Sequence, residues 1–157
     1  MPTLHLMHGF LGAGKTTFAK QLETQLPAVR YTPDEWMVRL FGVDSPAEHF
    51  QQNLDAVFDI IEGHWPRVVA CGVDVILDFG FWSRAARDLV RQRAAQLGCA
   101  SQLYAVRCSE ATARRRCALR NENLSGSLLI TDNTFNVLQA RFEPLGADEP
   151  FTLVATE

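Results

Sequence analysis

The sequence predicts an α/β fold of three layers, in which a five-stranded parallel sheet is covered by helices on both faces. Two observations predict it. Short apolar segments alternate with amphipathic segments of helical periodicity, so strands and helices follow one another along the chain. A glycine-rich stretch also follows the first apolar segment and precedes the first amphipathic one, which is typical of a strand, a loop and a helix in succession.

The first strand is expected at residues 3–7 and the first helix at residues 16–26, where Pro27 ends it. A second apolar run begins at Ala28, and the strand that it predicts ends at Asp34. A short helix containing Trp36, Val38 and Leu40 is expected after Asp34.

The next helix has a recognisable start. Ser45 is expected to be its N-cap, with Pro46 in the first turn and Glu48 closing a capping box. Because proline lacks an N–H, Pro66 is expected to kink or restart this helix, which then ends at Gly72.

The second half of the chain continues the alternation of strands and helices. Residues 73–78 are apolar enough for a central parallel strand, and Ser83 caps the helix that follows it. The remaining elements are a helix to residue 97, a strand at 102–106, a helix at 109–120, a polar loop at 121–127, a helix at 131–142 and a strand at 151–155.

Length and composition predict a single globular domain over residues 1–157. Of these residues, 47% are hydrophobic and 21% are charged, which is the usual balance for a protein with one buried core. Neither an apolar run long enough to span a bilayer nor a secretory leader is apparent, so we expect a cytoplasmic protein without a membrane partner. A net charge of −3 argues against broad binding to nucleic acid.

The glycine-rich stretch fits the phosphate-binding pattern G-x-x-x-x-G-K-[ST] and predicts a nucleotide site. Its glycines allow successive backbone N–H groups to surround a phosphate, while Lys15 reaches the β- and γ-phosphates and the hydroxyl of Thr16 ligates Mg²⁺. The predicted nucleotide-binding residues are Gly9, Leu11, Gly12, Ala13, Gly14, Lys15, Thr16 and Thr17.

Two acids follow predicted strands whose carboxyl ends share one edge of the sheet with this loop. Asp78 is typical of a carboxylate that holds Mg²⁺ opposite Thr16, although it could also cap the following turn. Asp34 is in the position of a base that accepts the proton of a substrate hydroxyl. The alternative for Asp34 is the N-cap of the next helix, and the two roles are compatible.

Arginines supply the charge that phosphoryl transfer requires. Arg116 and Arg120 are four residues apart, so they project from one face of the predicted helix and are candidates for stabilising the equatorial oxygens of the transferred group from a lid. Alternatively, this basic cluster is a solvated helix face.

A third group of residues is expected to contact the substrate. The aromatic side chains Trp36, Phe81 and Trp82 could shape a pocket for an organic molecule, or could be buried for packing. Arg39 and Arg87 could hold an anionic group of the substrate or pair with nearby acids.

Four segments of the chain resemble the small P-loop kinase family. They are the loop G-F-L-G-A-G-K-T-T, V-I-L-D-F-G-F-W-S-R-A-A-R, A-R-R-R-C-A-L-R-N and R-F-E-P-L-G-A-D-E-P. The family includes proteins like zeta toxins, chloramphenicol phosphotransferases and gluconate kinases, and the kinase domains of polynucleotide kinases; many members are labelled only as AAA-type ATP-binding proteins. The resemblance covers nearly the whole chain.

This resemblance implies the fold of P-loop NTPases with the strand order 2-3-1-4-5, and ATP as the nucleotide. It also implies that Lys15 and Thr16 bind phosphate and Mg²⁺, that Asp34 is the base, and that Arg116 and Arg120 act from a lid. Members differ most in the substrate pocket, where this chain has its aromatic run. Because the chain ends soon after the fifth strand, we do not expect a carboxyl-terminal helix over adenine.

Two alternatives compete with a kinase. The loop is also similar to that of CobW-like GTP-binding metallochaperones, but guanine recognition there commonly uses N-K-x-D, and neither Lys15 nor Lys20 follows an asparagine. The other alternative is a non-catalytic ATP-binding regulatory module, which would have no use for Asp34. The sequence therefore predicts transfer of the γ-phosphoryl group of ATP, with Mg²⁺, to a hydroxyl of a small-molecule acceptor.

Overall fold

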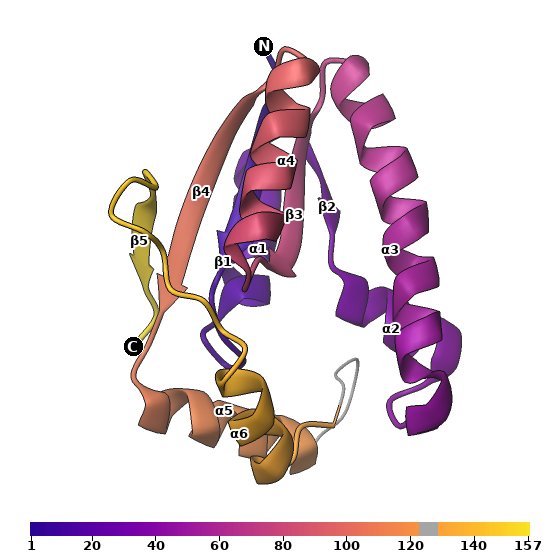
Figure 1. Cartoon of the computed structure of the whole chain (residues 1–157), viewed down its shortest axis with the longest axis vertical. Coiled ribbons are helices and arrows are strands. Elements are labelled where there is room, and N and C mark those ends of the chain that lie inside the picture. Colours follow the sequence, from indigo (N-terminus) through magenta and orange to yellow (C-terminus); the bar gives the residue numbers. More distant parts are fainter. Residues whose placement is uncertain (123–128) are drawn as a thin grey trace.

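The computed structural model describes residues 1–122 and 129–157. Strands and helices alternate along most of these residues, as the sequence predicts (Figure 1). In chain order the elements are β1 (Thr3–His8), α1 (Lys15–Gln25), β2 (Ala28–Tyr31), α2 (Pro33–Phe41), α3 (Ala47–Ala70), β3 (Asp74–Gly80), α4 (Arg84–Gln96), β4 (Ala100–Arg107), α5 (Glu110–Glu122), α6 (Asp132–Gln139) and β5 (Thr152–Ala155).

The sheet has the expected topology. Its five strands are parallel and lie in the order β2-β3-β1-β4-β5, so the predicted fold class and strand order are confirmed. The central strand β1 pairs with two neighbours, and its Leu6 lies beside Leu77 of β3 and Leu103 of β4. All three leucines are buried, because both faces of this central region are covered.

Helices cover the two faces of the sheet unequally. On one face, α3 and α4 pack on a core that includes Leu4, Val75 and Leu77. On the other face, α1 packs on Met7 and Ile76, which alternate with those residues along β1 and β3. Helices α5 and α6 lie beyond the carboxyl ends of the strands (Figure 1). This edge of the sheet therefore faces α5 and α6, with the loop between β1 and α1 beside them.

Strand β2 is shorter than predicted. It ends at Tyr31, and Thr32 is the N-cap of α2, with Pro33 at the start of the helix. The fixed φ of proline suits the first helical turn, and this explains why the helix begins here. Asp34 therefore lies in the first turn of α2 and is neither the end of the strand nor the N-cap of the helix.

The predicted capping box of α3 is wrong. The N-cap residue is Pro46, one position later than predicted, and no side chain caps the helix. A proline with φ of −53° followed directly by helix leaves Ser45 outside the first turn. Ser45 is thus too far back to receive the backbone N–H groups that an N-cap side chain accepts.

Helix α3 is continuous through Pro66 and is not restarted there. Proline donates no bond to the carbonyl four residues earlier, which belongs to Glu62. That carbonyl instead accepts a hydrogen bond of 3.0 Å from the guanidinium of Arg93 in α4. The same guanidinium stacks on Trp65 at 4.8 Å from the ring centre. Long-range contacts from α4 therefore compensate for the proline.

The last helices differ slightly from the predicted bounds. Helix α5 extends to Glu122, and α6 ends at Gln139 rather than at residue 142. Most of the predicted polar loop, residues 123–127, lies outside the described residues. Within the described part of the chain, no helix combines the length and the apolar character that crossing a membrane requires.

Candidate active site

The glycine-rich loop lies between β1 and α1 and rests directly against α5. Gly12 has φ of +76°, and a Cβ atom there would come within 2.4 Å of the carbonyl oxygen of Ala113. Only glycine satisfies both the backbone angle and this close approach. Of the other predicted phosphate-binding positions, Ala13 is buried, Leu11 is half-buried against α5, and Thr17 is exposed on α1.

Lys15 is the first residue of α1, and its ammonium group lies over the loop. Its Nζ donates a hydrogen bond of 2.9 Å to the carbonyl of Phe10. Burial lowers the pKa of Lys15, whereas the negative charges of Asp78 and Asp34 act in the opposite direction. The lysine, the loop and both predicted acids therefore belong to one electrostatic site.

Asp78 lies at the carboxyl end of β3 and faces the start of α1. Its Oδ2 accepts a hydrogen bond of 2.6 Å from the hydroxyl of Thr16 and another of 3.0 Å from the hydroxyl of Thr32. Its Oδ1 is buried without a hydrogen-bond partner among the described residues. A buried carboxylate oxygen beside a threonine hydroxyl fits the one or two protein ligands that Mg²⁺ usually takes beside phosphates.

Asp34 is brought to the same edge by α2. Its side chain is open to solvent, but the surrounding protein raises the pKa of its carboxyl by desolvation. The charge of Lys15 lowers this pKa, and that of Asp78 raises it. A carboxylate whose pKa is raised is a stronger base than a free one, which is the direction that proton abstraction requires.

The two predicted lid arginines have different surroundings. Arg116 is tied to the loop and to the carboxyl-terminal residues: it donates to the carbonyl of Gly12 at 3.1 Å, to the hydroxyl of Thr156 at 2.9 Å and to the carbonyl of Thr156. Arg120 is exposed, and its charge lowers the pKa of both Lys15 and Asp34. Arg120 thus lies near enough to the charged site for its charge to act there, whereas Arg116 supports the loop.

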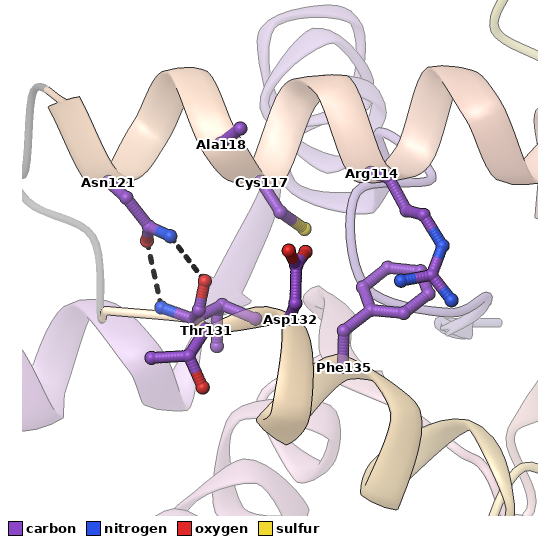
Figure 2. A pocket seen from close by; sticks show the side chains of 8 residues that line it. Arg114, Cys117, Ala118, Asn121, Thr131, Asp132 and Phe135 are labelled. Atoms are coloured by element: carbon purple, nitrogen blue, oxygen red, sulfur yellow. Dashed lines mark hydrogen bonds between the residues drawn. The ribbon is translucent and has the colours of Figure 1, made fainter.

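Helix α6 holds α5 in place beside the loop. A pocket of about 140 Å³ lies between the two helices, and Figure 2 shows Cys117 and Asp132 facing each other across it. At one end the side-chain amide of Asn121 binds the backbone of Ile130, and at the other Arg114 lies over Phe135, 4.3 Å from the ring centre. The pocket is too small for a nucleotide.

The turn after β3 is strained and contacts the loop. Gly80 has φ of +82°, and Phe81 has φ of +49°, which is uncommon for a bulky residue. This backbone directs the indole of Trp82 toward the loop, where Nε1 donates a hydrogen bond of 3.0 Å to the carbonyl of Gly9. The ring centre of Trp82 lies 5.2 Å from that of Phe10. Strain of this kind persists where surrounding contacts enforce it.

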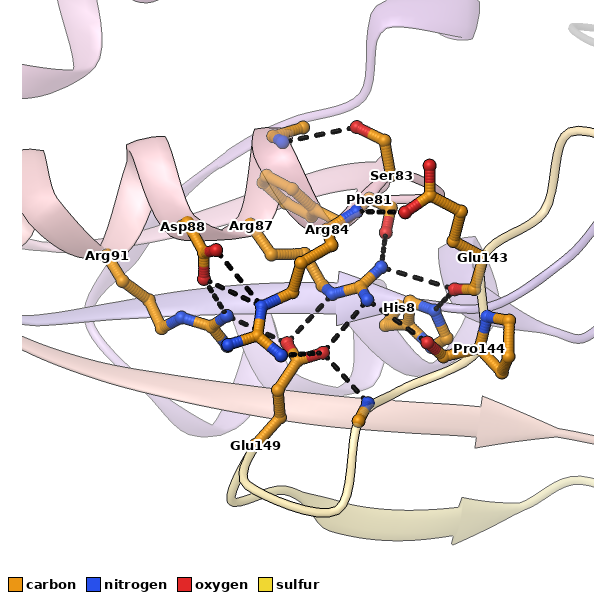
Figure 3. A network of polar contacts seen from close by, with 12 residues as sticks. His8, Phe81, Ser83, Arg84, Arg87, Asp88, Arg91, Glu143, Pro144 and Glu149 are labelled. Carbon is orange, nitrogen blue, oxygen red and sulfur yellow. Dashed lines mark hydrogen bonds and ion pairs between the residues drawn. The ribbon is translucent and has the colours of Figure 1, made fainter.

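Arg87 is buried in an ion pair with Glu149 (Figure 3). Both side chains are almost fully inaccessible to solvent, and two nitrogens of Arg87 each lie 2.9 Å from a carboxylate oxygen of Glu149. Arg87 also donates to the carbonyls of Phe81 and Pro144. This geometry gives Arg87 a structural role in fixing the connection before β5, in place of the predicted contact with substrate.

The other predicted substrate residues lie on α2. Trp36 is half-buried, with its ring centre 6.2 Å from that of Tyr31, and Arg39 is exposed in the last turn. Among the predicted aromatic residues, Phe81 is 4% exposed and packs into the main core. Of these aromatic residues, only Trp82 contacts the phosphate loop among the described residues, whereas Trp36 packs beside Tyr31 and Phe81 lies in the core.

Several residues of the site do not stand out in the sequence. His8 is buried directly before the loop, and desolvation lowers its pKa to about 4. Thr32 binds Asp78, and Thr156 accepts from Arg116 and donates to the carbonyl of Ala13. The sequence could have pointed to His8, because it directly precedes the glycine-rich loop. The contacts of Thr32 and Thr156 could not be read from the sequence, because they depend on the tertiary fold.

The family of the chain follows from a comparison with known protein families. The family model AAA_33, described as an AAA domain, matches residues 4–145, which include the loop, both acids and α5. The chain belongs to this AAA domain family. A search of the curated proteins found no match.

Solved structures place this AAA domain among P-loop kinase-like folds. Kti12 from Chaetomium thermophilum in complex with ADP-AlF3 is 19% identical with a TM-score of 0.70, and the match covers 97% of this chain and 88% of that chain. A gluconokinase from Sinorhizobium meliloti is 14% identical with a TM-score of 0.60, covering 98% and 82%. APS kinase from Mycobacterium tuberculosis in complex with AMPPNP and APS is 16% identical with a TM-score of 0.60, covering 98% and 88%. At these identities the likeness shows the fold.

Proposed function

We propose that this AAA domain transfers the γ-phosphoryl group of ATP, with Mg²⁺, to a hydroxyl of a small-molecule acceptor. The observation that carries the proposal is the geometry at the carboxyl edge of the sheet. Lys15 lies over the loop, 2.9 Å from the carbonyl of Phe10, and Asp78 accepts a hydrogen bond of 2.6 Å from Thr16. The charges of Asp34 and Arg120 act on the pKa of Lys15 at this edge. Kinases among the similar folds, and the complexes of Kti12 with ADP-AlF3 and of APS kinase with AMPPNP, support nucleotide binding by this chain.

Residues 9–17 would bind the nucleotide phosphates. The amino terminus of α1 presents backbone N–H groups beside Lys15, and a helix N-terminus attracts anions. Lys15 would exchange its contact with the carbonyl of Phe10 for phosphate oxygens. The Gly12 contact with Ala113 and the Trp82 contact with Gly9 hold the loop from both sides, which limits reorganisation on binding.

Asp34 would act as the base toward the acceptor. Its carboxylate takes the proton of the acceptor hydroxyl while that oxygen forms a bond to the γ-phosphorus, and the bond to the β,γ-bridging oxygen breaks to release ADP. Arg120 would stabilise the negative charge on the transferred group. Arg116 would keep the loop and the carboxyl-terminal residues together.

Thr16 and Asp78 fit a Mg²⁺ ion. The unpartnered Oδ1 of Asp78 and the hydroxyl of Thr16 are oxygen donors of the kind that magnesium prefers. The bound ion would neutralise charge on the phosphates of ATP. Thr32 would keep the Asp78 carboxylate oriented through its hydrogen bond.

The proposal is tested by measuring ATP affinity and transfer to a panel of hydroxylated acceptors. Lys15→Ala should abolish nucleotide binding or turnover, whereas Lys20→Ala should preserve both, because Lys20 lies on the outer part of α1 and pairs with Glu35. Asp34→Asn should retain ATP affinity and lose transfer, with Asp59→Asn at an exposed position of α3 as the matched control.

Four outcomes would contradict the proposal. Normal transfer by Asp34→Asn would show that Asp34 is not the base. Selective turnover of GTP would favour a GTP-driven metallochaperone. Tight ATP binding with no transfer to any acceptor would favour a regulatory module. Transfer to the 5′-hydroxyl of an oligonucleotide in preference to small molecules would show that the acceptor is a polynucleotide and not a small molecule.

A further inference from the structure

A groove lies between α3 and α4 on the face of the sheet opposite α1. Its volume is about 440 Å³, which is within the range of about 300–1,000 Å³ for small-molecule sites. Most of its lining is apolar or aromatic, from the two helices and from the strained turn after β3. The lining residues are Phe58, Glu62, Phe79, Phe81, Trp82, Ser83, Ala86, Leu89, Val90 and Arg141.

Aromatic rings form one wall of the groove. The ring of Phe79 meets Phe58 edge-on with centres 4.9 Å apart and stacks on Phe81 with centres 5.3 Å apart. Leu89 of α4 contributes an apolar side chain that is 57% exposed. An apolar molecule in the groove would remove this area from water.

Two of the polar side chains that line the groove, Glu62 and Ser83, are already engaged with residues outside it or with the backbone. Glu62 binds Arg93 and accepts a hydrogen bond of 3.0 Å from Trp65, while the hydroxyl of Ser83 caps α4 by accepting from Ala86. Arg141 is exposed at the rim. A sugar or other polyol would lose hydration from many hydroxyls here and find few partners in exchange, which is unfavourable.

The groove and the phosphate loop share one residue. Trp82 lines the groove, and its indole nitrogen binds the carbonyl of Gly9 at the start of the loop. A molecule that lies against Trp82 is therefore one side chain away from the start of the loop. The hydrogen bond to Gly9 fixes the indole in this orientation, directly after the positive φ angles of Gly80 and Phe81.

We infer that this groove binds the acceptor, and that the acceptor is a hydroxylated compound with a flat apolar body, such as an aromatic alcohol. The inference rests on the proposed function, in which the hydroxyl of the acceptor is phosphorylated by ATP. The ring system lies between Phe58, Phe79 and Leu89, and the hydroxyl extends past Trp82 toward the phosphate loop. Sugars and other polyols are not the substrates of this site.

The experiment compares two probes, naphthylethanol and sorbitol, on the full chain. Binding is measured by calorimetry in the presence of ATP, and transfer is measured as phosphorylated product. Leu89→Lys places a charge in the groove at an exposed position, so folding should be preserved. The matched control is Leu97→Lys at the end of α4, where the leucine is 43% exposed and lies outside the groove.

We expect naphthylethanol to bind and accept phosphate, and sorbitol to do neither. Leu89→Lys should weaken naphthylethanol binding about tenfold without changing ATP affinity, because one wall of the groove becomes charged. Leu97→Lys should behave like the unmodified protein. Equal naphthylethanol affinity in both variants would overturn the groove assignment.

Failures of the two proposals are distinguishable. Phosphorylation of sorbitol with no binding of naphthylethanol would refute the acceptor class and leave the kinase proposal standing. Binding of naphthylethanol that depends on Leu89, with no transfer to any acceptor, would support the groove and refute the kinase proposal. A change of oligomeric state in Leu89→Lys without probe binding would show that a second copy of the chain covers the groove.

Discussion

The indole nitrogen of Trp82 donates a hydrogen bond of 3.0 Å to the carbonyl of Gly9, across 73 positions of the chain. This bond connects the turn after β3 to the first residue of the phosphate loop. The backbone carbonyl of Trp82 also accepts a bond of 2.8 Å from the N–H of Glu143, in the connection before β5. Trp82 thus joins the phosphate loop, the turn after β3 and the connection before β5, which are distant from one another in sequence.

Replacing Trp82 with phenylalanine should therefore loosen the loop while keeping an aromatic ring beside Phe10. The loss of one hydrogen bond to Gly9 predicts a rise in the KM for ATP of about threefold to tenfold, with little change in kcat. Steady-state kinetics would measure this, with Asp59→Asn at an exposed position of α3 as the control. An unchanged KM would show that the bond does not fix the loop.

Arg120→Ala and Arg116→Ala should have different effects. Because the charge of Arg120 acts at the charged site, its loss should lower kcat by about 100-fold or more and leave ATP affinity nearly unchanged. Loss of Arg116 removes bonds to Gly12 and Thr156, so ATP affinity and thermal stability should both fall. Identical kinetic and stability profiles for the two variants would contradict this division.

Glu149→Gln should be strongly destabilising. Arg87 holds the pKa of the Glu149 carboxyl far below its usual range, and both groups are buried, so neutralising Glu149 leaves a buried cation unpaired. The expected loss is about 3–5 kcal/mol in the free energy of unfolding, measured by denaturant titration. Asp148→Asn is the control, since Asp148 pairs with Arg84 at the surface and should cost less than about 1 kcal/mol.

A double variant separates the charge from the packing at this site. Arg87→Met combined with Glu149→Leu removes both charges and should recover much of the stability that Glu149→Gln loses. A double variant less stable than Glu149→Gln would mean that the bonds of Arg87 to the carbonyls of Phe81 and Pro144 are the main contribution.

The lowered pKa of the buried His8 predicts that the folded protein loses stability in acid. The pKa of His8 is lowered from 6.5 to about 4, so the unfolded chain binds a proton that the folded protein rejects. Stability is therefore complete above pH 6.5 and falls by about 3 kcal/mol as the pH is lowered to about 4. Comparing unfolding of the unmodified protein and His8→Leu across this range should show a flatter curve for the variant. Parallel curves would exclude His8 as the cause.

The fold was predictable because its signals are local. Alternating apolar and amphipathic segments specify strands and helices, and the glycine-rich loop marks the junction of β1 and α1. Element boundaries were less predictable where proline was involved: Pro33 begins α2 earlier than expected, and Pro46 displaces the cap of α3. These errors arise because the residues around Pro33 and Pro46 are compatible with more than one turn or cap geometry.

The partners of charged residues were less predictable than their positions. The sequence places Asp34 and Asp78 at neighbouring strand ends, and the structure brings their charges together with Lys15. Arg87 looked like a substrate residue because its partner, Glu149, is 62 positions away. Such pairs are specified by the packing of β5 and its connection, which local patterns do not describe.

The bond between Arg93 and the carbonyl of Glu62 has a consequence for selectivity. It links α3 to α4 beside the groove, at the carbonyl that Pro66 releases. Two walls that are fastened to each other cannot separate to admit a bulkier guest or draw together around a smaller one. Little ordering entropy then remains to be lost on binding, and molecules of unsuitable thickness are rejected by shape alone.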